Sequence, residues 1–336
     1  MKKSILLFAI LCFGLAAAFS QTGSITNVQA AQRSDGSGLV DVYFTLDGTG
    51  SSYFMNLRVS FDAGGTYFPI TRSSISGDTG PVNPGANKHI VWDATIDHPN
   101  RYSPQTKLMV IASVLESTNP CPGTPHVIDY DENFYNTVKI GDQCWMKENL
   151  NTTRTADGND IGRMCYANNF ENCELYGGLY AWSTMMNGSA SSSANPSGVQ
   201  GICPNGWHIP SDAEWTELTD YLINTYLDIT ASNVGNKLKS CRQVNSPLGG
   251  DCSTMEHPRW DSNATHYGTN DFGFSALPGG YYIGGSFADL GSRGYWWSST
   301  EGSSGGWDRY MGNNFGEVNR SNGNKSFGFS VRCVRD

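Results

Sequence analysis

The 336-residue sequence has little of two things, long apolar runs and positive charge. Its one long apolar run lies at the N-terminus, and no later stretch approaches the roughly 20 apolar residues of a membrane-spanning helix. Lys and Arg number 22 against 31 Asp and Glu, and no basic stripe interrupts the net charge of −9. Because binding to phosphate backbones needs a positive surface, we exclude nucleic acid as a partner. We also expect no membrane span outside the N-terminal run.

The sequence also lacks the short motifs of common catalytic and metal sites. No H-E-x-x-H, Gly-rich phosphate loop or C-x-x-C is present. The six histidines are scattered, and we interpret His257 and His266 as ordinary loop residues. Asp212 and Glu214 lie two apart on a predicted helix, so they point in different directions and cannot flank one glycosidic bond. We therefore predict no catalytic residue and no metal ligand.

The N-terminal run reads as a signal peptide over residues 1–20. Lys2 and Lys3 precede the apolar stretch, small residues end it, and cleavage is expected before Gln21. Large Leu11 precedes Cys12 where lipidation needs a small residue. We therefore expect an exported protein, located in the periplasm, on the outer surface or outside the cell.

The cysteines divide the remaining chain. Apart from Cys12, none precedes residue 120, and eight follow it: Cys121, Cys144, Cys165, Cys173, Cys203, Cys241, Cys252 and Cys333. An even number in an exported chain predicts four disulfides, for which about 105 connectivities are possible. Cys165–Cys173 and Cys241–Cys252 are local pairs that would each close a loop of about ten residues.

Residues 21–116 read as a β-sandwich of immunoglobulin or fibronectin type. "LVDVYFTL", "FMNLRVSF" and "KLMVIASV" alternate apolar and polar residues, which predicts half-buried strands. Turn-forming stretches such as "DAGGT" and "NPGAN" separate them, and frequent turns over about 95 residues suit a sandwich. A Pro-rich linker follows at 117–126.

Residues 127–336 read as an α+β domain with short strands and long ordered loops. "SDAEWTELTDYLINTYLD" places Trp215, Leu218 and Leu222 along one helical stripe. Ser211 and Glu214 form a capping box at its start. We interpret "ICPNGWHIPSDAEW" as this helix start, and we favour a structural role for His208 while leaving its function open.

Six ordered segments of this second half resemble the Fibrobacter succinogenes major paralogous domain: "YNTVKIGDQCWMKENL", "GLYAWSTMM", "CPNGWHIPSDAEW", "DFGFSALPGGYY", "GYWWSST" and "GFSVRCVRD". The resemblance covers roughly Val127 to Asp336. It implies a fold similar to that of C-type lectins and of the formylglycine-generating enzyme, and no assigned activity. The first half resembles the sandwich module found before this domain in exported proteins of Bacteroidota.

The resemblance also implies a disulfide pattern and limits the cofactors. A lectin-like fold joins Cys203, before the helix, to Cys333 in the last strand, which leaves Cys121 with Cys144. The calcium triplets of sugar-binding lectins are missing, and their nearest counterpart is "GWDRYMGNN" at 306–314. "DGND" at 157–160 is the best local calcium candidate, although such a tetrad is usually a solvated turn. We therefore predict no cofactor and leave calcium open.

The span from Phe272 to Phe329 is rich in aromatic and amide side chains, which suit stacking on sugar rings or anchoring a protein. Its candidate ligand residues are Tyr281, Tyr282, Arg293, Trp297, Trp307, Arg309, Asn313 and Asn314, and either Trp296 or Trp297 is expected to be buried. The sequence thus favours a non-catalytic binding or adhesion protein for a glycan or a surface protein. An enzyme of the formylglycine-generating type and a purely structural surface component remain alternatives.

Overall fold

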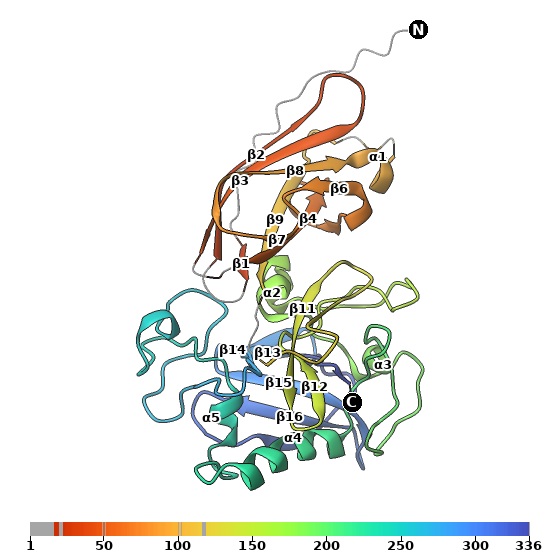
Figure 1. Cartoon of the computed structure of the whole chain (residues 1–336). Coiled ribbons are helices and arrows are strands. Elements are labelled where there is room, and N and C mark those ends of the chain that lie inside the picture. The colour runs from red at the N-terminus through yellow and green to blue at the C-terminus, as the bar shows by residue number, and fades with distance from the viewer. Residues whose placement is uncertain are drawn as a thin grey trace. The chain divides into compact units, whose positions relative to one another are not determined.

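The computed structural model of the chain describes residues 17–19, 23–48, 50, 52–99, 101, 103–115 and 119–335. The chain divides into two compact units, 1–115 and 116–336, which Figure 1 shows in one drawing and which are described separately below. Most of the predicted signal peptide lies outside the described residues. Its described part, β1 (Ala17–Phe19), pairs in parallel with β9. Cleavage before Gln21 would therefore remove β1 and its pairing with β9.

The first unit is a β-sandwich of two sheets. One sheet has the order β2-β3-β8-β6, and the other has the order β1-β9-β4-β5 with β7 paired to β4. The elements are β2 (Gly23–Gln32), β3 (Leu39–Gly48), β4 (Tyr53–Ser60), β5 (Phe68–Pro69), η1 (Arg72–Ser74), β6 (Ile75–Gly77), β7 (Gly80–Val82), β8 (Gly85–Asp93), α1 (Ala94–Asp97) and β9 (Lys107–Val114). Both sheets contribute side chains to one apolar core, in which hydrophobic burial holds them together.

The predicted alternation is confirmed in β3 and is incomplete in the other sheet. Val40, Val42, Phe44 and Leu46 of β3 are all buried in the sandwich core. In β4 every residue is buried, and in β9 the side chains of both parities are buried along most of the strand. The period of two therefore predicted where these strands lie, but it did not predict that both of their faces are covered.

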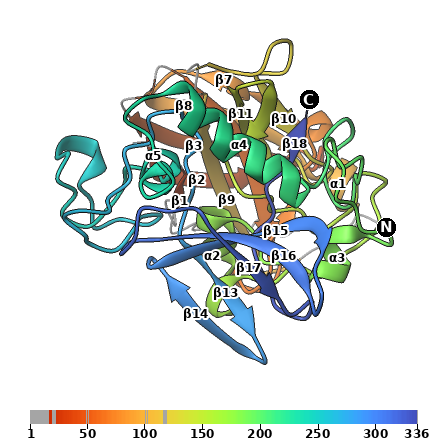
Figure 2. The same cartoon turned by 90° about the horizontal axis from the view of Figure 1, so that it is seen from below.

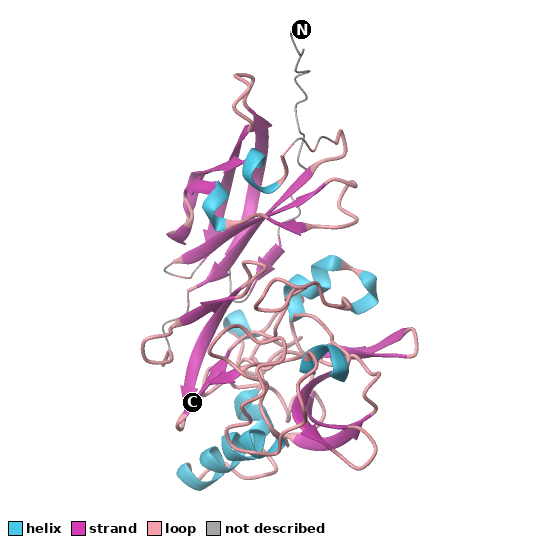
Figure 3. Cartoon of the chain, turned by 90° about the vertical axis from the view of Figure 1, so that its right-hand side faces the viewer, coloured by secondary structure: helices cyan, strands magenta, loops and turns pink. Residues whose placement is uncertain are grey.

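The second unit contains two further sheets, of order β10-β11-β12-β18 and β14-β13-β15-β16-β17. The strands are β10 (His126–Ile128), β11 (Phe134–Ile140), β12 (Gln143–Met146), β13 (Gly279–Ile283), β14 (Ser286–Leu290), β15 (Arg293–Glu301), β16 (Gly306–Gly312), β17 (Asn319–Gly323) and β18 (Val334–Arg335). The helices are η2 (Tyr166–Asn168), α2 (Phe170–Tyr176), α3 (Trp182–Met186), α4 (Asp212–Thr225), α5 (Val234–Leu238) and η3 (Gly250–Cys252). Figure 3 shows how much of this unit is loop.

Strand β15 separates two apolar cores of the second unit. Trp296 packs with Trp215 of α4 and with Phe274, while Trp297 packs on the opposite face against Phe329. Helix α4 lies along one face of β15 and β16 (Figures 1 and 2). Both tryptophans are 0% exposed. One of the two tryptophans was expected to be buried. Both are, because this sheet is covered on both faces.

The last segment of the chain is not one continuous strand, and Cys333, which was expected in the last strand, lies just before it. Gly328 and Ser330 form isolated bridges with Tyr282 and Trp296, in the sheet that contains β15. The chain then crosses to the other sheet, where β18 pairs with β12. A continuous strand would have to stay in one sheet, so this crossing shortens the regular strand to Val334–Arg335.

Four disulfides cross-link the second unit, and they are the expected pairs: Cys121–Cys144, Cys165–Cys173, Cys203–Cys333 and Cys241–Cys252. Cys121 lies within the predicted linker, and the backbone oxygen of Asn119 accepts a hydrogen bond from Lys139 of β11. The described end of this linker is thus an ordered part of the second unit. Four disulfides indicate an oxidising compartment outside the cytoplasm.

Candidate functional site

The segment around the start of α4 has a structural role. The Ser211 hydroxyl accepts a hydrogen bond from the Glu214 amide at 3.1 Å, and the Glu214 carboxylate accepts one from the Ser211 amide at 2.8 Å. The predicted capping box is therefore confirmed. The other carboxylate oxygen of Glu214 lies 2.5 Å from Nε2 of His208. Because Glu214 is fully buried, His208 helps to hold the capping carboxylate in place.

Replacing Ser211 with alanine should lower the free energy of unfolding of the second unit by about 1–2 kcal/mol, the usual contribution of such a cap. Urea unfolding followed by tryptophan fluorescence measures the change. Ser286→Ala at an exposed strand position is the matched control, with an expected change within about 0.5 kcal/mol. Equal losses in the two variants would contradict the role of the cap.

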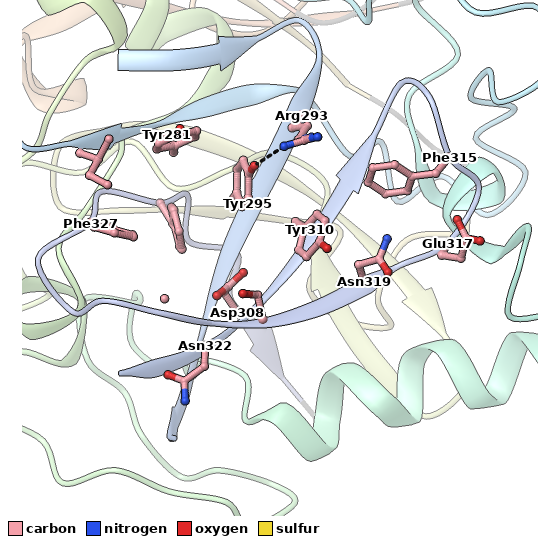
Figure 4. Close-up of a pocket in the computed structure, with 14 residues that line it drawn as sticks. Tyr281, Arg293, Tyr295, Asp308, Tyr310, Phe315, Glu317, Asn319, Asn322 and Phe327 are labelled. Atoms are coloured by element: carbon pink, nitrogen blue, oxygen red, sulfur yellow. Dashed lines mark hydrogen bonds between the residues drawn. The ribbon is translucent and has the colours of Figure 1, made fainter. Parts of the chain in front are cut away.

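A cavity of about 590 Å³ lies in the second unit, over the face of β15, β16 and β17 that carries Tyr295, Asp308 and Tyr310 (Figure 4). Its lining combines aromatic rings with a few acids, amides and hydroxyls: Tyr281, Ile283, Arg293, Tyr295, Asp308, Tyr310, Phe315, Glu317, Asn319, Ser321, Asn322, Gly323, Phe327 and Phe329. All of these residues lie within the span that the sequence singled out for its aromatic content.

The aromatic rings of the cavity form one connected row. Tyr295 and Tyr310 are directly opposite on β15 and β16, and their rings stack with centroids 5.5 Å apart. Phe329 also stacks with Tyr295, at 5.0 Å between ring centroids, and Phe315 meets Tyr310 edge to face at 5.8 Å. Figure 4 shows the row running from Phe327 to Phe315, with Asp308 near its middle. The row gives the cavity an aromatic lining.

Asp308 is the most unusual group in this lining. Asp308 is only 1% exposed, and neither carboxylate oxygen accepts a well-formed hydrogen bond from a described residue, although the Gly323 amide lies close enough to act on it. Burial raises the pKa of Asp308 to about 7, against smaller lowering effects of the Gly323 amide and of Arg309. Buried polar groups are rarely left unpaired, and each such case calls for an explanation.

The cation at the edge of the cavity is already paired. The Arg293 guanidinium lies 3.4 Å from the Asp289 carboxylate and 3.4 Å from the Tyr295 hydroxyl, which in turn donates to Asp289 at 3.0 Å. Burial raises the pKa of Tyr295 to about 12, so this phenol stays protonated at neutral pH. The arrangement fixes Tyr295 and leaves the charge of Asp308 uncompensated.

Comparison with protein-family models identifies the domain that carries this cavity. Residues 138–335 match the model of the Fibrobacter succinogenes major domain, which is more than half of the chain. The chain belongs to this family. No curated protein and no solved structure gives a match. The match includes every residue of the cavity, so the cavity is a feature of the Fibrobacter succinogenes major domain in this chain.

Of the eight candidate ligand residues, Tyr281 and Arg293 line the cavity of the major domain. Tyr282 packs against Phe287 with ring centroids 5.0 Å apart. Asn313 and Asn314 lie in the loop after β16, where the Asn313 amide donates to the backbone of Ser292. These last three candidates do not line the cavity.

Two further candidates, Trp297 and Arg309, are buried and do not line the cavity. The indole N–H of Trp297 donates to the Tyr180 carbonyl at 2.8 Å inside the core. Arg309 is 7% exposed, and its guanidinium meets the Asp212 carboxylate of α4 at 2.7 Å. Trp307 is half-buried beneath Arg320, whose guanidinium carbon lies 3.5 Å from the ring centroid. Trp307 does not line the cavity either.

Four residues that were not among the candidates also line the cavity: Asp308, Phe315, Asn319 and Phe327. Along β16, side chains alternate between the face that carries α4 and the face that carries the cavity. Arg309 bonds to α4, so Asp308 and Tyr310 belong to the cavity face. The ion pair that fixes this parity joins Arg309 to Asp212, 97 positions away, so no signal within β16 itself could have identified the cavity face.

Metal ligands do not gather in the described part of the major domain or of the first unit. No group of at least three His, Cys, Asp or Glu side chains there could hold a metal ion. Calcium binding by oxygen atoms at 157–160, which the sequence left open, is not tested by this observation. In the same described residues, every helix is too short or too polar to cross a membrane.

Proposed function

We propose that this chain is an extracytoplasmic, non-catalytic binding protein that holds an oligosaccharide in the cavity of its major domain. The observation that carries the proposal is Asp308, a buried carboxylate that accepts no well-formed hydrogen bond from a described residue, in a cavity lined by aromatic rings. Sugars bring neighbouring hydroxyl groups, which can donate to both carboxylate oxygens at once. Their apolar C–H faces suit aromatic surroundings.

The size and polarity of the cavity support a small ligand over a flat protein interface. Ligand pockets are typically concave, about 300–1,000 Å³ in volume, and apolar with a few placed polar groups. The cavity holds about 590 Å³, and Asn319, Ser321 and Asn322 add amide and hydroxyl groups beside the rings. Amides donate and accept hydrogen bonds, as sugar hydroxyls require of their partners.

The same proposal includes a finer assignment of both folds. A C-type-lectin-like fold for the major domain is supported by the disulfide from Cys203, before α4, to Cys333 near the last strand. An immunoglobulin-like fold for the first unit is supported by its two packed sheets. Export by the signal peptide and a place at or outside the cell surface complete this proposal, and the disulfides support them.

The enzyme alternative receives less support. An enzyme of the formylglycine-generating type needs a reactive pair of cysteine thiols, and all eight cysteines after residue 120 are bonded to one another. A purely structural role explains neither the open cavity nor the unpaired Asp308. A protein ligand remains an outcome that the experiment below can report.

Binding of the mature full chain to an oligosaccharide array, with calcium and with a chelator, tests the proposal. We expect retention of a defined set of oligosaccharides and a loss of affinity of about tenfold or more in Tyr310→Ala, because central aromatic residues dominate such interfaces. Tyr226→Ala is the matched control, since Tyr226 is 39% exposed at the end of α4 and does not line the cavity.

Three outcomes separate the possibilities. Oligosaccharide binding that falls in Tyr310→Ala and persists in Tyr226→Ala supports the proposal. A blank array in both calcium conditions refutes it and favours a protein ligand or a structural role. Binding that is unchanged in Tyr310→Ala refutes the cavity as the site.

A further inference from the structure

The charges of the cavity are unbalanced. Among the described residues that line it, the charged side chains are Asp308, Glu317 and Arg293. Arg293 is paired with Asp289, which neutralises the one cation in this lining. The charged groups of this lining are therefore two carboxylates and one cation that is already paired.

Among the described residues, Asp308 has no counter-ion on its own face of the sheet. The neighbouring cation along β16, Arg309, bonds to the Asp212 carboxylate and to the Thr216 hydroxyl of α4 on the other face. Arg320 of β17 reaches the same Asp212 at 2.7 Å. Opposite and beside Asp308, the cavity is lined by Tyr295, Tyr310, Ser321 and Phe329, none of which is positively charged.

A buried carboxylate without a counter-ion is expensive, because its desolvation is not offset by a nearby positive charge. Hydroxyl groups of a neutral sugar would supply hydrogen bonds but would not neutralise the negative charge of the carboxylate. A protonated amine supplies both, and charge-assisted hydrogen bonds are about twice as strong as neutral ones. The chemistry of Asp308 thus discriminates among oligosaccharides.

We propose that the ligand is an oligosaccharide with a free amino group, whose ammonium is held by Asp308 at the middle of the aromatic row. This inference rests on the proposed function and names the class of sugar. In the complex, the ammonium occupies the buried end of the cavity, and the sugar rings lie along the row of Tyr310, Tyr295 and Phe329. Glu317, at one end of the cavity, adds to the attraction for a cationic chain.

Calorimetric titration of the mature full chain tests the inference with three oligomers of equal length: glucosamine, N-acetylglucosamine and glucose. We expect the glucosamine oligomer to bind at least tenfold more tightly than the other two. Asp308→Asn, which keeps the side-chain shape and removes the charge, should weaken glucosamine binding about 30-fold or more and abolish the preference. Asp142→Asn, at an exposed turn, should bind all three as the wild type does.

The result distinguishes the inference from the proposed function. If the neutral oligomers bind as tightly as the amino oligomer, or if Asp308→Asn weakens all three equally, the amino-sugar inference is overturned and the binding function stands. If none of the three binds and the oligosaccharide array is also blank, the proposed function itself fails. Circular dichroism of Asp308→Asn confirms that a loss of binding does not reflect unfolding.

Discussion

Replacing both Cys203 and Cys333 with alanine is expected to lower the free energy of unfolding of the second unit by about 5 kcal/mol. The two residues are 130 positions apart and fully buried, so their disulfide removes much chain entropy from the unfolded state. Urea unfolding followed by tryptophan fluorescence reports this unit, because eight of the nine tryptophans follow residue 120.

The disulfide between Cys241 and Cys252 is the matched control, since it joins residues only 11 positions apart. Replacing both of these cysteines with alanine should cost about 2 kcal/mol less than removing the long-range pair, because the entropic gain grows with the logarithm of loop length. A loss for the long-range pair that does not exceed the loss for the local pair would contradict this account.

Features that depend on nearby residues could be predicted from the sequence. The capping box needs only Ser211 and Glu214 at the right spacing, and the stripe of Trp215, Leu218 and Leu222 is buried as the helical period requires. The buried face of β3 follows from its alternation in the same way. In each case the signal and the structure lie within a few residues of each other.

Features that depend on what covers a surface could not be predicted in this way. The pattern of "GYWWSST" gives adjacent tryptophans on opposite faces, but nothing in it says that both faces are covered. The side of β16 that faces α4 is fixed by Arg309 and Asp212, which are 97 positions apart. The absence of a partner for Asp308 is visible only once the surrounding strands are in place.

The second unit contains two buried aspartates with raised pKa values and opposite surroundings. Burial raises the pKa of Asp129 to about 6 and that of Asp308 to about 7. Asp129 accepts hydrogen bonds from the Asp131 and Asn133 amides, from the Asn133 side chain and from the Tyr135 hydroxyl. Asp308 has no comparable set of donors: neither of its oxygens accepts a well-formed hydrogen bond from a described residue, and the Gly323 amide acts on it only weakly. The first carboxylate is thus held by the fold, whereas the second is not.

Asp308→Asn is therefore expected to stabilise the ligand-free protein at pH 8 and to have little effect at pH 4. Because its folded pKa lies above the unfolded value, the native state binds more protons between about pH 4 and pH 7, and wild-type stability falls as the pH rises through this window. Asparagine does not titrate, so the gain relative to wild type grows to at most about 4 kcal/mol at pH 8.

Asp129→Asn is the matched control for this prediction, and it should destabilise the protein at pH 8 by about 2 kcal/mol or more, because an amide cannot accept hydrogen bonds from all four donors. Urea unfolding of both variants and of the wild type at pH 4 and pH 8 measures the two signs. If Asp308→Asn is also destabilising at pH 8, its carboxylate supports the fold and the binding site at Asp308 is refuted. Opposite signs would show that the charge of Asp308 destabilises the ligand-free protein. Residues that serve binding and not folding commonly lower stability in this way.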